Sequence, residues 1–220
     1  MGERQEILRN SLILAGLHVE AGWKPAIAGS SIASEYWPEI ERTYSELGGI
    51  LAVAPLGVGK YDMVVDGHPT ELDEEQHFNR YRLVTLGSRF YKAESEFAGA
   101  YRGYCLRHEQ YCLRKANHGG YWTNGSTERQ FGSPSAPPDL DNGGAPRWKQ
   151  RAFYDFMKDV HGASTGQPVI RLSVWDRVTS RGEARPLGRL LDVGLSGEWL
   201  TATAELWQRR VEEALTFLRQ

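Results

Sequence analysis

Two short β-type runs joined by a tight turn constrain the fold of this chain more than any other stretch. Residues 61–65 alternate and become β-branched toward their end, as strands do. Asp66-Gly67 is a turn dipeptide, and residues 70–73 have the pattern of a returning strand. The stretch therefore predicts a β-hairpin, and the segments before it are expected to form scaffold.

Acidic side chains gather at the end of this predicted hairpin. Glu71 and Asp73 are two residues apart on one strand, so they share a face. Asp62 lies across the turn, where strand pairing can bring it beside them. Three carboxylates repel one another unless a cation lies between them, and oxygen ligands suit Mg²⁺ or Mn²⁺. The alternative is that these are ordinary surface acids, because charged runs are usually solvated faces.

The order of residues around these acids resembles the PD-(D/E)XK nuclease superfamily. The pattern there is an Asp at the start of one strand, a turn, and Glu-x-Lys on the next. Asp62 matches the Asp, Glu71 matches the Glu, and Asp73 stands in the place of the Lys. A closer likeness, to a branch related to very-short-patch repair and phage homing endonucleases, comes from the aromatic residue before Asp62 and from ELDEEQHF at 71–78. Glu74 departs from that branch, which usually has Gly there.

The resemblance implies an α/β fold with a mixed central β-sheet of four or more strands flanked by helices, as in a restriction-endonuclease-like core. It implies one nuclease-like domain over residues 1–220. The implied activity is that of a metal-dependent DNA endonuclease, of the restriction type because no accessory domain is visible, with repair or homing as alternatives. The implied ligands for Mg²⁺ or Mn²⁺ are Asp62, Glu71 and Asp73. The implied partner is double-stranded DNA, and cutting both strands favours a homodimer.

Three further residues are candidates for catalysis. Gln76 and His77 follow the acidic strand, and His77 would move a proton or contact phosphate, since an imidazole ordinarily titrates near neutral pH. The alternative for His77 is a core histidine. Lys149 precedes a strand that contains Val169-Ile170-Arg171, an arrangement similar to the same nuclease branch. Lys149 would then supply the positive charge of the family's Lys, whose place Asp73 occupies. The alternative is that Lys149 is a solvated lysine.

Basic side chains after the hairpin are candidates for contact with a nucleic-acid backbone. They are Arg80, Arg82 and Arg151. The alternative for Arg80 and Arg82 is that they neutralise Glu74 and Glu75 in salt bridges. A structural zinc site is a separate hypothesis, and its ligands would be Cys105, His108, Cys112 and His118. The first three share a helical face, but the spacing matches no familiar zinc motif, which favours a packed helix.

The rest of the chain has a helical pattern with short strands. Residues 119–146 are rich in Gly, Pro, Ser and Asn and predict a long loop, and residues 177–197 are irregular. Strands are expected at 50–54 and 168–174. Helices are expected at 3–20, 31–47, 90–117, 147–160 and 198–220.

Composition excludes some classes of protein and leaves others open. The net charge of −2 requires any basic surface to be local, and no apolar run is long enough to span a membrane. Two cysteines do not form a disulfide framework, so a cytoplasmic protein is expected. Two other functions are consistent with the sequence. One is a nucleic-acid-binding or defence-associated protein that does not cleave, and the other is a helical interaction protein.

Overall fold

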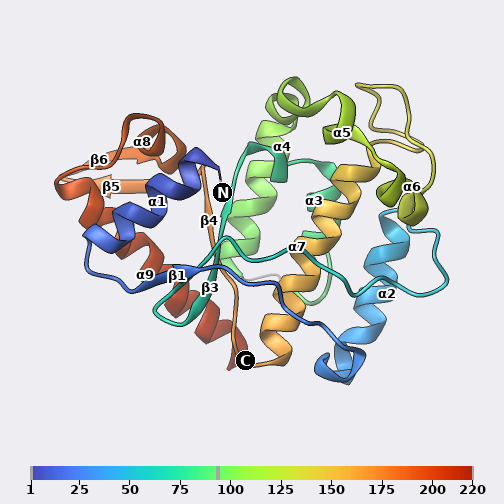
Figure 1. The fold of residues 1–220 in the computed structure, drawn as a ribbon, viewed down its shortest axis with the longest axis horizontal. Helices are drawn as coiled ribbons and strands as arrows, with labels where there is room; N and C mark the ends of the chain where they lie inside the picture. Colours follow the sequence, from blue (N-terminus) through green and yellow to red (C-terminus); the bar gives the residue numbers. More distant parts are fainter. Residues whose placement is uncertain (1, 93–94, 220) are drawn as a thin grey trace. The chain divides into compact units, whose positions relative to one another are not determined.

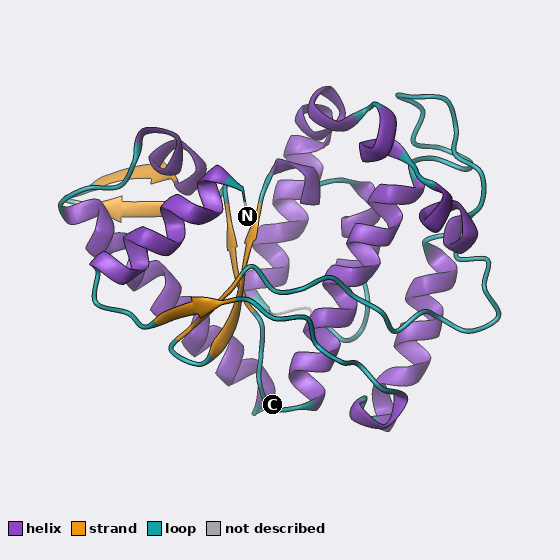
Figure 2. Cartoon of the chain, in the orientation of Figure 1, coloured by secondary structure: helices purple, strands orange, loops and turns teal. Residues whose placement is uncertain are grey.

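The chain has a mixed α/β fold, so the expected fold class is confirmed (Figures 1 and 2). The computed structural model describes residues 2–92 and 95–219. The chain divides into two compact units. We call the first the sheet unit, formed by Met1–Pro25, Gly59–Glu74 and Gly166–Gln220. We call the second the helical unit, formed by Ala26–Val58 and Glu75–Thr165.

The sheet unit contains a four-stranded sheet with the order β1-β2-β3-β4. β1 pairs with β2 and β2 with β3 in antiparallel fashion, whereas β3 and β4 are parallel. The expected mixed sheet is therefore confirmed. Its strands are β1 Val19–Ala21, β2 Met63–Val65, β3 His68–Asp73 and β4 Ile170–Ser173.

The predicted hairpin is present, and its turn explains why the sequence predicts it well. Asp66 and Gly67 have φ of 44° and 82°, the left-handed pair that a two-residue hairpin turn requires. The Asp66 backbone N–H donates to the His18 carbonyl, and Asp66 Oδ1 accepts from the His18 N–H at 2.8 Å. The turn is therefore tied to the segment that leads into β1.

The sheet unit also holds a second, two-stranded sheet where the sequence predicts irregular chain, so that prediction is wrong. On the main sheet, α9 packs against β4, and Trp207 Nε1 donates to the buried Thr70 Oγ1 at 3.2 Å. This contact places the Thr70 face of β3 against α9. The further elements of the unit are β5 Arg177–Ser180, β6 Glu183–Pro186, α1 Glu3–Leu14, α8 Leu187–Val193 and α9 Glu198–Leu218.

The helical unit is built from four main helices that lie side by side, as Figure 1 shows for α4, α3, α7 and α2. Its core is aromatic, with Phe153 and Phe156 fully buried on α7. The main helices are α2 Trp37–Glu46, α3 Arg80–Leu86, α4 Glu96–Ala116 and α7 Pro146–Ser164. The short ones are η1 Gly29–Ser31, η2 Ser34–Tyr36, η3 Glu75–His77, α5 Gly119–Trp122 and α6 Gly125–Phe131.

The helix expected at 31–47 is present and begins at Trp37, because Pro38 is tolerated only in the first turn. Two other local predictions for the helical unit are wrong. The expected strand at 50–54 does not form, since the Ile50 N–H donates to Gln130 O rather than to a strand. The expected loop at 119–146 contains α5 and α6. In α6 the Asn124 side chain accepts from the N–H groups of Ser126 and Thr127, which caps the helix.

The remaining expected helices are present, with shifted ends. The helix expected at 3–20 ends at Leu14, and Val19 and Glu20 belong to strand β1 instead. The helix expected at 147–160 continues to Ser164, and the one expected at 90–117 starts at Glu96. Residues 93–94 and 220, which the expected helices include, lie outside the described residues. Within the described part of the chain, no helix is both long and apolar enough to cross a membrane.

Candidate functional site

Asp62 immediately precedes β2 at the end of the hairpin. The paired residues of β2 and β3 end at Met63 and Thr70, so Asp62 lies just outside the ladder. Asp62 Oδ2 accepts a hydrogen bond from the Leu72 backbone N–H at 2.9 Å. The Asp62 side chain is therefore anchored to β3 at the residue that follows Glu71.

A close backbone approach holds this end of the hairpin. The Tyr61 N–H donates to the Trp23 carbonyl at 2.9 Å, which ties the residue before Asp62 to the segment after β1. A Cβ on Gly22 would lie 1.9 Å from the Tyr61 carbonyl oxygen. Only glycine therefore fits at position 22 without moving the backbone next to Asp62.

Asp73 forms a buried ion pair with Arg171. Nη1 of Arg171 lies 2.9 Å from Oδ1 and 3.1 Å from Oδ2 of Asp73, and both side chains are 1% exposed. The parallel register also places Arg171 beside Glu71, which is 4% exposed. In the sequence, Arg171 is visible only as part of the strand pattern Val169-Ile170-Arg171. An arginine between apolar residues of a buried strand was the available signal, because a buried charge requires a partner.

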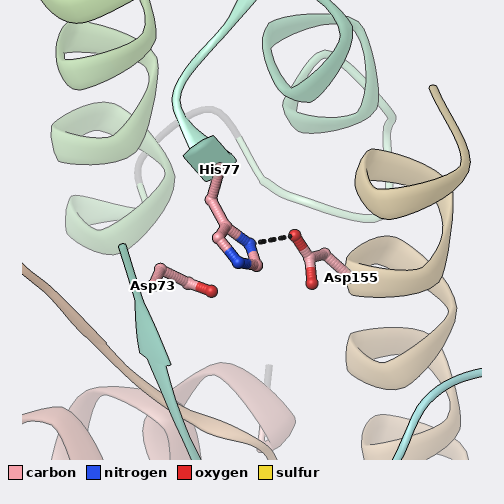
Figure 3. A group of neighbouring side chains, drawn as sticks. All are labelled: Asp73, His77 and Asp155. Carbon is pink, nitrogen blue, oxygen red and sulfur yellow. Dashed lines mark hydrogen bonds and ion pairs between the residues drawn. The ribbon is translucent and has the colours of Figure 1, made fainter. Parts of the chain in front are cut away.

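His77 is paired with Asp155 inside the helical unit. Figure 3 shows the His77 ring directed at the Asp155 carboxylate, and Nδ1 lies 2.8 Å from Oδ2. His77 ends η3, whereas Asp155 comes from the middle of α7 and is 3% exposed. A carboxylate only accepts hydrogen bonds, so Nδ1 carries the proton. Asp73, also labelled in Figure 3, ends β3 in the sheet unit.

Sequence reasoning missed Asp155, because the pairing joins positions 78 residues apart. The carbonyl oxygen of Gln76, beside His77, accepts from Asn79 Nδ2 at 3.2 Å and from Arg151 Nη1 at 3.3 Å. Arg151 therefore supports the backbone of the short helix that carries His77.

The other two candidate arginines are engaged with carboxylates. Arg82 is 1% exposed, and its Nη2 lies 3.2 Å from Asp159 Oδ2. Arg80 is 43% exposed in its side chain and bonds both Glu109, at 3.0 Å, and Asp141, at 2.7 Å. Arg82 is therefore a buried residue in a salt bridge with Asp159 of α7, a partner that the sequence did not predict. Arg80 is the more exposed of the two, but its charge is shared by two acids.

Lys149 lies in the helical unit, close to Tyr81. The residue is 5% exposed, and its Nζ is 5.5 Å from the centre of the Tyr81 ring, a cation–π contact. Burial lowers the pKa of Lys149 and raises the pKa of Tyr81 to about 12. The lysine is therefore held against an aromatic ring, and the alternative of a solvated lysine is wrong.

The cysteine and histidine side chains proposed for zinc do not form a site in the described residues. Cys105 and Cys112 are free thiols and buried. Burial raises the pKa of Cys112 to about 12, so this thiol stays protonated in the metal-free chain. His118 is exposed at the start of α5. The packed-helix alternative therefore accounts for Cys105 and Cys112.

A model of a protein family of unknown function, DUF7255, matches residues 42–193, which is more than half of the chain. The match includes the β2–β3 hairpin, α7 and β4. No curated protein and no solved structure matches the chain.

Proposed function

We propose that this chain, which belongs to the DUF7255 family of unknown function, is a metal-dependent endonuclease that hydrolyses phosphodiester bonds of double-stranded DNA, of the restriction type. The observation that carries the proposal is the hydrogen bond that Asp62 Oδ2 accepts from the Leu72 N–H at 2.9 Å, which anchors Asp62 to β3 next to Glu71. Asp62 and Glu71 offer carboxylate oxygens at the same end of the hairpin. The PD-(D/E)XK-like order of residues in the same hairpin supports the same reaction.

The donor chemistry fits Mg²⁺ or Mn²⁺, which prefer carboxylate, carbonyl and water oxygens. Asp62 and Glu71 would hold the ion, with help from the Leu72 carbonyl. When bound, the ion would lower the pKa of a water molecule and screen the charge of the scissile phosphate. Asp73 has both oxygens on Arg171 and would orient that arginine.

We assign to Arg171 the role of the positively charged Lys that the nuclease pattern has at the position of Asp73. A guanidinium is charged at every relevant pH, and the register places this one beside Glu71. Three carboxylates and one guanidinium leave these four groups with a net charge of −2, which one divalent ion balances. This assignment replaces Lys149, whose ammonium group is held over the Tyr81 ring.

His77 is assigned to proton transfer. Asp155 accepts from Nδ1, which fixes the tautomer and the orientation of the ring, so the proton exchanged would be on Nε2. Asp155 is thus a positioning residue that acts through His77.

A second candidate function is nucleic-acid binding without cleavage. The specific observation in its favour is that Glu71, Asp73 and Arg171 are each at most 4% exposed. A buried ion pair of this kind also occurs as a purely structural feature. This candidate predicts DNA binding that a chelator does not change, with no product.

The deciding experiment incubates supercoiled plasmid with the purified chain and Mg²⁺ or Mn²⁺, with and without EDTA. We expect nicked or linear DNA only when the ion is present. Glu71→Gln and Asp62→Asn should abolish cleavage and weaken Mn²⁺ binding in calorimetry, because they remove charge and keep shape. Glu20→Gln, which changes an exposed acid on β1 of the same sheet, is the matched control and should cleave like the wild type. Retained cleavage in folded Glu71→Gln would refute the proposal.

A further inference from the structure

Helix α4 carries the same four residues twice. Tyr-Cys-Leu-Arg occupies positions 104–107 and again 111–114. Seven residues make nearly two turns of an α-helix, so matching members of the two copies lie on one face. Cys105 and Cys112 are both buried, which gives the two copies the same orientation in the structure. The tyrosines and arginines of the two copies therefore recur along one line of the helix.

Each copy places a cation over an aromatic ring. The Arg107 guanidinium lies 5.5 Å from the centre of the Tyr104 ring, and the Arg114 guanidinium lies 5.5 Å from that of Tyr111. Lys115 Nζ is 5.8 Å from the Tyr111 ring. A cation held over an aromatic face has a preferred position before any ligand arrives, which lowers the entropic cost of binding.

The positive charge of this face is not neutralised by the protein. Arg107, Arg114 and Lys115 are exposed, and none of them forms an ion pair with a carboxylate of residues 2–92 or 95–219. Glu109, the acid between the copies, is bound through both oxygens by Arg80. A chain with a net charge of −2 therefore concentrates three uncompensated cations on one helix.

We propose that this face of α4 binds the phosphodiester backbone of a nucleic acid. With a rise of about 1.5 Å per residue, the two arginines are separated by roughly 10 Å along the helix. One strand of B-form DNA presents a phosphate about every 3.4 Å along its axis, so the face matches about three phosphates. The inference rests on the proposed function and deepens it, because it names the surface that holds the polymer.

The chemistry of the face favours a nucleic acid over a lipid surface. A helix that lies on a membrane presents an apolar face to the lipid. The apolar stripe of α4, which includes Tyr101, Cys105 and Cys112, is buried within the protein. Leu106 is 72% exposed, but a single apolar side chain does not make an inserting face.

The test is the binding of fluorescent oligonucleotides, as a duplex and as a single strand, measured by anisotropy in EDTA across a series of salt concentrations. The variant is Arg107→Gln/Arg114→Gln/Lys115→Gln. The matched control, Lys24→Gln/Arg189→Gln/Arg209→Gln, removes three exposed cations from the sheet unit. Each lost phosphate contact makes the slope of log K against log salt shallower by about one. We expect a slope shallower by about three and an affinity at least about tenfold lower at ~0.1 M salt for the α4 variant, with the control unchanged.

Equal slopes for the α4 variant and the wild type would overturn the inference, as would an equal loss in the control. Binding to anionic vesicles with no binding to either oligonucleotide would also overturn it. EDTA removes divalent ions, so the result does not depend on the proposed reaction. If Glu71→Gln abolishes cleavage while the α4 variant binds normally, the proposed function stands and this inference fails. If the chain cleaves no DNA, and the α4 variant still loses binding relative to the wild type, this inference stands and the proposed function fails.

Discussion

Nη1 of Arg171 lies 2.9 Å from Oδ1 and 3.1 Å from Oδ2 of Asp73, across two parallel strands. The pair puts an arginine from one strand against an aspartate that occupies the lysine position of a nuclease-like hairpin. Both side chains are almost completely buried, so each charge depends on the other to offset its loss of hydration. The relationship has a direct consequence for stability.

Removing one member of this pair should cost much more than removing both. Arg171→Met is expected to lower the free energy of unfolding by about 3–5 kcal/mol, because it leaves a buried carboxylate without this partner. Arg171→Met combined with Asp73→Leu should cost clearly less than the sum of the single changes. Urea unfolding of the double-mutant cycle measures this coupling. Additive costs would show that the two charges do not depend on each other.

Lys149→Met should stabilise the chain at neutral pH and less so in alkali. Burial lowers the pKa of Lys149 below its ordinary 10.5. Between the lowered pKa and 10.5 the unfolded chain binds more protons than the folded one, so wild-type stability rises with pH there. The cost of the buried ammonium is present in full below the lowered pKa and disappears toward pH 10.5. Urea unfolding at about pH 7 and about pH 10 measures the difference between the variant and the wild type.

The control for this prediction is Lys24→Met, at an exposed lysine. Its effect on the free energy of unfolding should be small and equal at both pH values. If Lys149→Met raises the free energy of unfolding by the same amount at both pH values, the burial of the charged amine is not the cause.

The two thiols should be unreactive in the folded chain. Burial raises the pKa of Cys112 to about 12, and Cys105 is 2% exposed. The thiolate is the reactive form, so Ellman's reagent at about pH 8 should modify neither cysteine until urea is added. Both thiols should then react. Rapid reaction of the folded chain, or stoichiometric zinc that blocks it, would restore the zinc hypothesis.

Asp155→Asn should slow plasmid cleavage roughly tenfold or more, because His77 loses the carboxylate that fixes its tautomer. The dependence of the rate on pH should change as well, which a merely structural loss would not produce. Glu212→Gln, at an exposed acid, serves as the control. An unchanged pH–rate profile with normal folding would remove His77 from the reaction.

Gly22→Ala should disturb the hairpin next to Asp62. The added Cβ would lie 1.9 Å from the Tyr61 carbonyl oxygen, so the backbone must move. We expect a lower melting temperature and weaker Mn²⁺ binding in calorimetry. Gly99→Ala, where nothing lies within 4 Å of the added Cβ, should raise helix stability by up to about 1 kcal/mol. Unchanged Mn²⁺ binding in Gly22→Ala would separate the ion site from this end of the hairpin.

The features that could be predicted from the sequence are those encoded by local backbone chemistry. Asp66-Gly67 predicts the hairpin because few other residue pairs tolerate two left-handed conformations. The β5–β6 hairpin has the same backbone at Arg181 and Gly182, with φ of 47° and 80°. An arginine rarely occupies the first of these positions, so the sequence carries no comparable signal. The short helix α6 has a readable cap at Asn124, but it spans too few residues for a periodic pattern.

Within one strand pair, the sequence predicts that Asp62 reaches the part of β3 that carries Glu71, and Asp62 Oδ2 accepts from the Leu72 N–H there. Arg171 depends on a parallel pairing with a strand about a hundred residues later, and Asp155 on the packing of α7 beside η3. No local pattern encodes such long-range contacts. The exposed cations of α4 differ, because they belong to a seven-residue repeat of Tyr-Cys-Leu-Arg that the sequence itself contains.

The buried thiols of α4 fix how this helix is rotated about its own axis. Inserting one residue between the copies would keep every charge and ring, yet it would turn Arg114 by about 100° relative to Arg107. It would also swing Cys112 out of the interior. The number of residues between the copies, more than the kinds of residue present, thus keeps the cations of α4 in line.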